Sequence, residues 1–363
     1  MPVRPLIEDD IPQVANLYWT VLRSRKLPVP PALECKLREL YFTNPWIDST
    51  LPSLVYDAGG GKVVGFLGVI SRRMSVRGKP IRIALGGNFV VRPDSRTSLA
   101  GMHLLATYMA GGQDISQTDS ANDLSRALLK RLGFKTILPF SVHWVRPLRP
   151  AHYAVYAISR SAGRAASATL RAVAKPLASV VDGMAARFSS NPFRQIETRL
   201  QAAELDVETL LCCLAEFRGG CSLWPEYDVN SLNWLLTFME RMKAYGELRK
   251  VALHDGSGKV VGWYIYFRKS GAVGEVVQIG GARQFIKEIL DHLFHDAWIH
   301  GTVAVHGVVD TRLMDDFSEK NCIFTCRGGW MLAYSRKSDL VDLLDSGDAF
   351  LSRLDGEWCL SLG

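Results

Sequence analysis

The sequence predicts an α/β (α+β) protein built from two similar modules, each a mixed, mostly antiparallel sheet flanked by helices, with a helical linker between them. Its 363 residues suggest two domains, at roughly 100–200 residues per domain. Hydrophobic residues make up 48% and charged residues 22%, as is usual for a folded globular chain. A Gly-rich turn followed by Lys-Val-Val-Gly occurs twice, at Lys62 and Lys259. This internal echo indicates that one module is made twice.

The elements after each echo come in the same order. β-Branched runs between turn residues predict strands, and apolar residues three or four apart predict helices. In the first half we expect a strand through Ile70, a strand over 81–91, a helix over 99–109, a strand over 114–118, a helix over 122–132 and a strand over 140–145. In the second half we expect strands over 260–267 and 274–279, a helix over 282–298, a strand over 302–309, a helix over 312–320 and strands within 322–334. We therefore divide the chain into an N-terminal domain (1–150), a linker (151–190) and a C-terminal domain (191–363).

The linker carries one apolar stripe at helical spacing, formed by Leu170, Val173, Leu177, Val180 and Met184. Pro176 is expected to kink or split this helix. Packing of the stripe against one or both modules is the favoured interpretation. Contact with an anionic membrane surface through the flanking basic residues ranks below it.

Positive charge is concentrated around this linker. Between Asp123 and Asp182 there are ten basic residues and no acidic one, and the whole chain carries +7. Such a span attracts anions, for example a phosphorylated cofactor. Without interleaved aromatic residues it gives little support to nucleic-acid binding, so no nucleic-acid partner is expected.

The N-terminus lacks the apolar segment of a secretory signal, and no apolar run is long enough to span a membrane. The seven cysteines are scattered without C-x-x-C spacing. We therefore expect a cytoplasmic protein with no metal site. His292 and His295 could share a helix face, but no ligand pattern completes a metal site there.

The most informative segment runs from Asn88 to Leu105, where a strand ends, a turn containing Pro93 follows and a helix begins at small residues. Unpaired N–H groups at a helix start favour phosphate, and Arg96 adds positive charge nearby. By itself this segment predicts an anion-binding turn.

The same segment resembles the cofactor motif of the GNAT superfamily of N-acetyltransferases, V-x-P-x-x-R/Q-G-x-G-x-G/A-x-x-L. The matching residues are Val91, Pro93, Arg96, Gly101 and Leu104. Thr97 and Leu99 replace glycines of that motif. A second family pattern is matched further along by Asn122, Leu128, Gly133 and Phe134.

The resemblance implies binding of acetyl-CoA or another acyl-CoA between two strands that splay apart, here those ending at Val91 and Thr118. An amine, on a small molecule or a polymer, would enter from the other side and attack the thioester directly. The implied cofactor-binding residues are Phe89, Val90, Val91, Arg96, Thr97, Ser98, Leu99, Ala100, Gly101 and Asn122. Leu99 would offer its backbone N–H and point its side chain away.

The usual acid and base of this family are missing. Leu129 stands where the family has its tyrosine acid, and the strand over 81–91 holds no carboxylate. Asp119 is the best candidate for the base, followed by Asp114 and Ser116. Asp119 is equally explained as a helix N-cap, and His103 as an ordinary helix residue.

The second module resembles the family only in the order of its elements. Gly280–Arg283 stands where its loop should be, without the motif, so we interpret this half as a degenerate copy, as in tandem GNAT proteins. The main hypothesis is an acyl-CoA-dependent N-acyltransferase. Two alternatives are a catalytically silent protein that binds coenzyme A or regulates a partner, and a tandem-GNAT aminoacyl transferase that uses charged tRNA.

Overall fold

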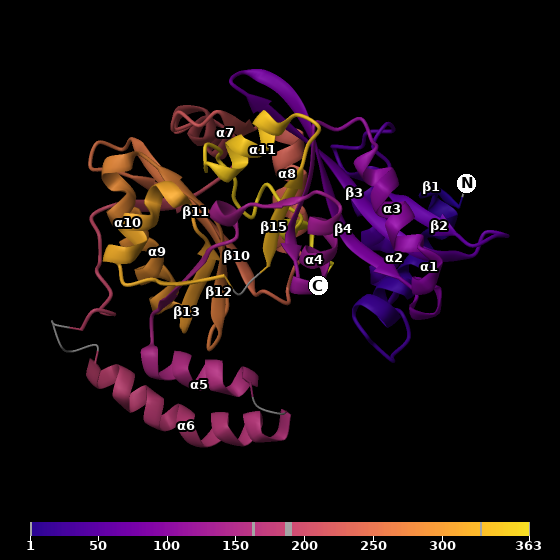
Figure 1. Ribbon diagram of the computed structural model, residues 1–363. Helices are drawn as coiled ribbons and strands as arrows, with labels where there is room; N and C mark the ends of the chain where they lie inside the picture. Colours follow the sequence, from indigo (N-terminus) through magenta and orange to yellow (C-terminus); the bar gives the residue numbers. More distant parts are fainter. Residues whose placement is uncertain (1, 162–163, 186–190, 327–328, 363) are drawn as a thin grey trace.

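The computed structural model has two mixed sheets side by side, with helices packed around them (Figure 1). It describes residues 2–161, 164–185, 191–326 and 329–362, without the side chains of 96–98, 160–161, 164–173 and 185. Within these residues, no helix has the length and apolar character needed to cross a membrane. The predicted fold class is confirmed.

Both sheets have the same strand order. The first runs β1 (Val3–Pro5), β2 (Leu54–Asp57), β3 (Val63–Val76), β4 (Lys79–Val91), β5 (Ile115–Ala121), β15 (Trp330–Tyr334) and β6 (Lys135–Thr136), with β9 (Leu223–Pro225) paired to β3. The second runs β8 (Gln201–Glu204), β10 (Glu247–His254), β11 (Val260–Arg268), β12 (Val273–Gly281), β13 (Ala304–Val308), β7 (His143–Pro147) and β14 (Ile323–Thr325). In each sheet one pair of neighbouring strands is parallel, β4 with β5 and β12 with β13, while the other paired strands are antiparallel.

The two halves of the chain exchange a strand. β7 leaves the first half and pairs with β13, and β15 returns from the second half to pair with β5, where Leu332 lies opposite Thr118. In Figure 1, β15 has the yellow end of the colour scale and lies next to elements of the violet half. Each sheet therefore contains strands from both halves of the chain. The domain boundaries at residues 150 and 190 stay a prediction, and so does the origin of the two halves by duplication.

The repeated turns have matching geometry. Oδ1 of Asp57 accepts a hydrogen bond from Gly59 N, and Oδ1 of Asp255 accepts one from Ser257 N, both at 2.8 Å. Such local bonds stabilise a turn before a strand. At the β3–β4 hairpin, Arg77 and Gly78 have φ values of 50° and 81°. Two successive positive φ values suit the two-residue turn that matches the twist of the strands.

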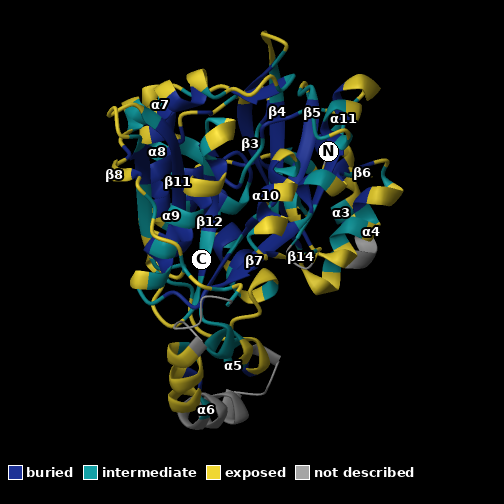
Figure 2. Ribbon diagram, turned by 90° about the vertical axis from the view of Figure 1, so that its left-hand side faces the viewer, coloured by how far each residue is buried: buried dark blue, intermediate teal, exposed yellow. Residues whose placement is uncertain are grey.

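Helices surround the buried strands (Figure 2). They are α1 (Ile11–Asn16), α2 (Pro31–Arg38), α3 (Ala100–Met109), α4 (Asp123–Arg131), α7 (Val207–Glu216), α8 (Val229–Glu240), α9 (Ile286–Ile299), α10 (Met314–Glu319) and α11 (Ser338–Asp345). One core cluster joins Ile70 of β3, Leu235 of α8 and Ile265 of β11. Because this cluster spans both sheets, the halves are packed as one body.

Helices α5 (Pro150–Ser161) and α6 (Arg164–Ala185) project from the body as a pair (Figures 1 and 2). Asp182 of α6 accepts hydrogen bonds from the first amides of α5, including Ala151 N at 2.9 Å. Pro176 was expected to kink or split the helix: a split is wrong, because α6 continues through it, and a kink stays a prediction. Packing of the apolar stripe is also wrong for its described members: Leu177, Val180 and Met184 are 67%, 60% and 57% exposed. The side chains of Leu170 and Val173 lie outside the described residues.

Candidate functional site between strands β4 and β5

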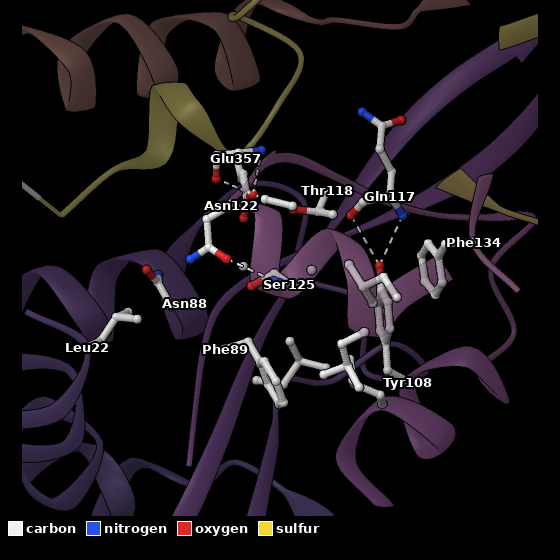
Figure 3. Close-up of a pocket in the computed structure, with 18 of the residues that line it drawn as sticks. Leu22, Asn88, Phe89, Tyr108, Gln117, Thr118, Asn122, Ser125, Phe134 and Glu357 are labelled. Carbon is white, nitrogen blue, oxygen red and sulfur yellow. Dashed lines mark hydrogen bonds between the residues drawn. The ribbon is translucent and has the colours of Figure 1, made fainter. Parts of the chain in front are cut away.

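Strands β4 and β5 diverge as they leave the middle of the first sheet. They pair only over Ile83–Leu85 and Ile115–Gln117, although β4 continues to Val91 and β5 to Ala121. The gap opens into a cavity of about 340 Å³, the first cavity, lined by both strands and by α3 and α4 (Figure 3). Backbone groups in the unpaired part of β4 are therefore left for another partner.

The hydroxyl of Tyr108 sits at the point where the strands separate. It accepts from Gln117 N at 3.1 Å (Figure 3) and donates to Ala84 O at 2.6 Å, so it bridges β4 and β5. Burial raises the pKa of Tyr108 far above its ordinary value, which keeps the hydroxyl protonated for this bridge. The hydroxyl of Tyr108 thus acts as a wedge between the strands: it binds a backbone carbonyl of β4 and a backbone N–H of β5 at the start of the gap.

A bulge in β4 bends its outer part. The pairing with β3 shifts between Val90 and Gly87, and Asn88 adopts a φ of 52°. Asn88 Nδ2 donates to the hydroxyl of Tyr41 at 2.8 Å. A Cβ on Gly68 of β3 would collide with that hydroxyl, so glycine is needed to seat Tyr41 beneath the bulge. Bulges of this kind re-aim a strand next to a functional site.

The predicted anion-binding turn precedes α3. Residues Pro93–Ser98 form a 3₁₀ turn, Leu99 adopts a left-handed conformation at φ 58°, and the helix begins at Ala100. The side chain of Leu99 is 59% exposed and leaves the turn clear. A Cβ on Gly101 would lie 3.1 Å from the ring of Phe89, so glycine allows the helix start to approach the end of β4. The side chains of Arg96, Thr97 and Ser98 lie outside the described residues.

Two carboxyl groups meet at the end of β5. Oε1 of Glu357, from the C-terminal tail, accepts hydrogen bonds from Thr118 Oγ1 at 2.6 Å and from the amide and hydroxyl of Ser120. Its Oε2 lies so close to β4 that a Cβ on Gly87 would collide with it. Glu357 therefore reaches across the gap between the strands (Figure 3). Asp119 Oδ1 accepts a hydrogen bond from Glu357 N at 3.1 Å.

Burial and mutual repulsion shift the acidity of this pair. Burial, followed by the charge of Glu357, raises the pKa of Asp119 to about 7, and backbone amides of Glu357 and Trp358 oppose the rise. Burial likewise raises the pKa of Glu357, against hydrogen bonds from Ser120 and Thr118. Two carboxyl groups buried this close together do not both ionise easily. Such a pair can take up or release a proton at physiological pH.

No protein-family model matches this sequence, and no protein with a curated description matches it. Solved structures do match the fold. A GCN5-related N-acetyltransferase from Anabaena variabilis ATCC 29413 aligns with a TM-score of 0.59 at 11% identity, covering 93% of this chain and 73% of that one. Another from Kribbella flavida gives a TM-score of 0.54 at 13% identity, covering 92% and 70%. N-myristoyltransferase of Saccharomyces cerevisiae with bound myristoyl-CoA gives 0.50 at 10% identity, covering 92% and 78%.

This chain has the GNAT fold. The resemblance seen in the sequence is thereby supported at the level of structure over more than nine tenths of the chain. Within this GNAT fold, Phe89 and Asn122 line the first cavity. Val90 is buried in the sheet. Val91 is the last residue of β4 and lies next to Gly101 at the start of α3.

Other candidate residues have structural partners. Asn122 is the N-cap of α4, where its Oδ1 accepts from Ser125 N at 2.8 Å, so the cap is Asn122 and not Asp119. Asp114 lies at the opposite end of β5 and binds Arg82 N and Lys337 Nζ. Ser116 accepts a hydrogen bond from Gln113, and the ring of His103 stacks on Tyr56.

The residue at the position of the family's acid, and one of the two histidines considered for a metal, have structural roles. Leu129 forms part of the apolar wall of the first cavity. His292 Nδ1 lies 2.9 Å from the hydroxyl of Tyr264. Among the residues that the structure describes, no three His, Cys, Asp or Glu side chains are grouped to hold a metal ion.

A second cavity, of about 690 Å³, adjoins the first, because Gln117 and Ser120 line both. Its walls come from both sheets, the C-terminal tail and α5. Asp119 lines this second cavity, whereas Glu357 lines the first. The acid pair therefore lies in the wall between two spaces.

Proposed function

We propose that this protein is an acyl-CoA-dependent N-acyltransferase that transfers an acyl group, most simply acetyl, from acetyl-CoA to an amine within a ternary complex. The observation that carries the proposal is the open gap between β4 and β5 with a carboxyl pair at its inner end. The fold likeness to N-acetyltransferases and to a myristoyl-CoA-bound N-myristoyltransferase supports it.

The first cavity fits the arm of an acyl-CoA. Because β4 has no strand partner on its β5 side beyond Leu85, the backbone groups that face this side can pair with an extended amide-bearing chain along Phe89–Val91. Gly101 leaves room at the start of α3, where helix N–H groups favour the diphosphate. Ala100 and Leu99 supply backbone N–H groups at that point, with Arg96, Thr97 and Ser98 in the preceding turn. When bound, the acyl-CoA supplies the thioester carbonyl as electrophile.

In this proposal, Asp119 is the base. With a pKa of about 7 it is substantially ionised at neutral pH and can accept a proton from an ammonium in the second cavity. Glu357 faces the first cavity, where its protonated form can donate to the leaving thiolate. Leu129 cannot supply that proton, so the role of the family's tyrosine would pass to Glu357.

Leu129 also favours a second candidate, a catalytically silent protein that binds coenzyme A or regulates a partner. Calorimetry with acetyl-CoA and a thiol-release assay with a panel of amines distinguish the two. We expect one acetyl-CoA bound per chain and amine-dependent thiol release. Binding without thiol release would support the silent protein, and no heat with any acyl-CoA would overturn the acyltransferase and the binding of coenzyme A by a silent protein.

Arg96→Glu tests the cofactor turn. A negative charge at that turn would repel the diphosphate, so acetyl-CoA affinity should fall at least tenfold. Arg92→Glu is the matched control, because Arg92 is exposed and pairs with Asp94. Equal affinities for Arg96→Glu and the wild type would remove Arg96 from the site.

A further inference from the structure

The second cavity carries chemistry that the first cavity does not explain. It has the volume typical of small-molecule sites, roughly 300–1,000 Å³. Two side chains in its wall are at least nine tenths buried and keep polar atoms without partners: Nε of Arg353 and Nδ1 of His143. Unpartnered buried polar atoms cost free energy unless a ligand or water pairs with them. Both atoms are covered by protein, so the size and lining of the cavity, rather than these atoms, indicate that it receives a molecule.

The charges of the cavity favour a single cation. Glu275 is already paired with Arg353, whose Nη1 lies 2.7 Å from Oε2. Although burial opposes its ionisation, this guanidinium holds the pKa of Glu275 at about 2. Asp355 accepts hydrogen bonds from Tyr227 and Ser352 at 2.6–2.7 Å. Of the described acidic residues in the wall, Asp119 is the one without a side-chain donor, so an ammonium would bind there.

Aromatic rings form part of the apolar wall, beside aliphatic side chains such as Val273 and Ile323. Tyr153 and Tyr156 come from α5, Phe140 from the segment before β7, and Trp358 from the tail. The rings of His143 and His306 stack with centroids 5.1 Å apart. Burial, followed by the charge of Arg353, lowers the pKa of His143 to about 4, so that ring is neutral. Such faces hold flat apolar bodies and cations by stacking and cation–π contact.

Helix α5 forms one side of the cavity and is fixed at its base. Arg149, just before α5, donates to Thr302 O and Trp298 O, both at 2.8 Å. Asp182 binds the first amides of α5 from the side of α6. The helical pair therefore holds Tyr153 and Tyr156 in place, which gives the projecting arm a role in the site.

We propose that the second cavity is the acceptor site and that it takes a compact primary amine on an aromatic body. The ammonium would bind at Asp119, and the ring would lie among Tyr153, Tyr156 and Trp358. This inference rests on the proposed function for the reaction, but the binding of the amine can be measured without it.

The first test compares acceptors by thiol release with acetyl-CoA. Tyramine is the probe, and spermidine and a short peptide with one free lysine are the alternatives. We expect kcat/KM for tyramine to exceed that for either alternative at least tenfold. A better rate with spermidine or the peptide would overturn the inference while leaving the proposed acyltransferase intact.

The second test measures tyramine binding by calorimetry on the whole protein without acyl-CoA. Tyr156→Ala and Tyr153→Ala should each weaken tyramine binding about tenfold, with acetyl-CoA affinity unchanged. Leu177→Ala, on the exposed face of α6, is the matched control and should bind tyramine as the wild type does. Failure of the wild type to bind tyramine, or unchanged binding by both tyrosine variants, would overturn the acceptor site. Loss of acetyl-CoA binding alone would instead contradict the proposed function.

Discussion

The two sheets contain the same gap, but only one gap is open. In the second sheet β12 and β13 pair over Val273–Glu275 and Ala304–His306 and then diverge, as β4 and β5 do in the first. In the second gap, aromatic side chains leave a space of about 30 Å³, against about 340 Å³ in the first cavity. Trp144 stacks on Phe317 at 4.7 Å, and Phe350 closes the same space. The backbone therefore creates the gap, and the side chains decide whether a ligand can enter.

The turns that precede α3 and α9 differ in the same way: the first is clear and the second is occupied by a side chain. At the start of α3, Gly101 and the outward Leu99 leave the turn clear. At the start of α9, Arg283 forms an ion pair with the buried Asp316. A guanidinium engaged with a protein carboxylate is not free to hold a phosphate. The comparison predicts one acyl-CoA site per chain.

The largest expected effect comes from Asp119→Asn. Removing a general base lowers rates by roughly 10²–10⁴-fold, so kcat should fall by that factor while acetyl-CoA affinity is kept. Steady-state kinetics and calorimetry on the same preparation measure both. Asp114→Asn, at the other end of β5, is the control and should retain most of the activity. If Asp119→Asn keeps full activity, Asp119 is not the base.

The pH dependence follows from the same residue. Because the base must be ionised, kcat/KM should rise with pH and level off above a pKa of about 7. Folding raises this pKa above its ordinary value of about 3.9, so the contribution of Asp119 to stability is lost as pH rises from about 4 to about 7. Relative to the wild type, Asp119→Asn should therefore become more stable over that range. Urea unfolding at pH 5 and pH 8 measures this difference, and an unchanged difference would contradict the raised pKa.

Hydrophobic periodicity and turn residues are local signals, and they predicted the element order and the helix start. The gap was predicted only through the family resemblance. The resemblance also led to Asp119 as a candidate base, because it follows a recognisable strand, and that role stays a prediction. Sequence reasoning missed Glu357, which reaches Thr118 from 239 residues away in the chain. It also missed Tyr108 and the exchange of β7 and β15, since nothing local distinguishes a buried wedge from an ordinary helix residue or states which sheet a strand joins.

Opening the second gap should destabilise the protein without creating a site. Trp144→Ala removes a fully buried ring, and such substitutions cost about 3–5 kcal/mol. Urea unfolding should show this loss, and calorimetry should still show one acetyl-CoA per chain. Leu129→Ala is the matched control, because it enlarges a cavity that already exists and should cost less. Binding of two acetyl-CoA molecules per chain in Trp144→Ala would contradict this expectation, because it would mean that the packed side chains alone keep acetyl-CoA out of the second gap.

Tyr108→Phe tests the wedge at the start of the first gap. The change leaves Ala84 O without its donor and Gln117 N without its acceptor, and an unsatisfied buried group costs about 1–3 kcal/mol. We expect a loss of stability in that range and weaker acetyl-CoA binding, because the two strands can shift towards each other. Wild-type stability and affinity in Tyr108→Phe would mean that the hydroxyl does not set the gap.

The smallest expected effect is at Leu99, the residue that departs from glycine in the family motif. A left-handed conformation costs a non-glycine residue about 1–2 kcal/mol of stability, and glycine avoids this cost. Glycine in turn loses about 0.5–1 kcal/mol of stability, because its unfolded chain has more conformational freedom. Because the side chain is 59% exposed, Leu99→Gly loses little packing and should stabilise the fold by up to about 1 kcal/mol. Leu124→Gly is the control of opposite sign: Leu124 is 82% exposed in helical α4, where glycine costs about 1 kcal/mol. Thermal unfolding of the two variants should therefore move in opposite directions, and a lower melting temperature for Leu99→Gly would mean that the turn at Leu99 is held by contacts of its side chain.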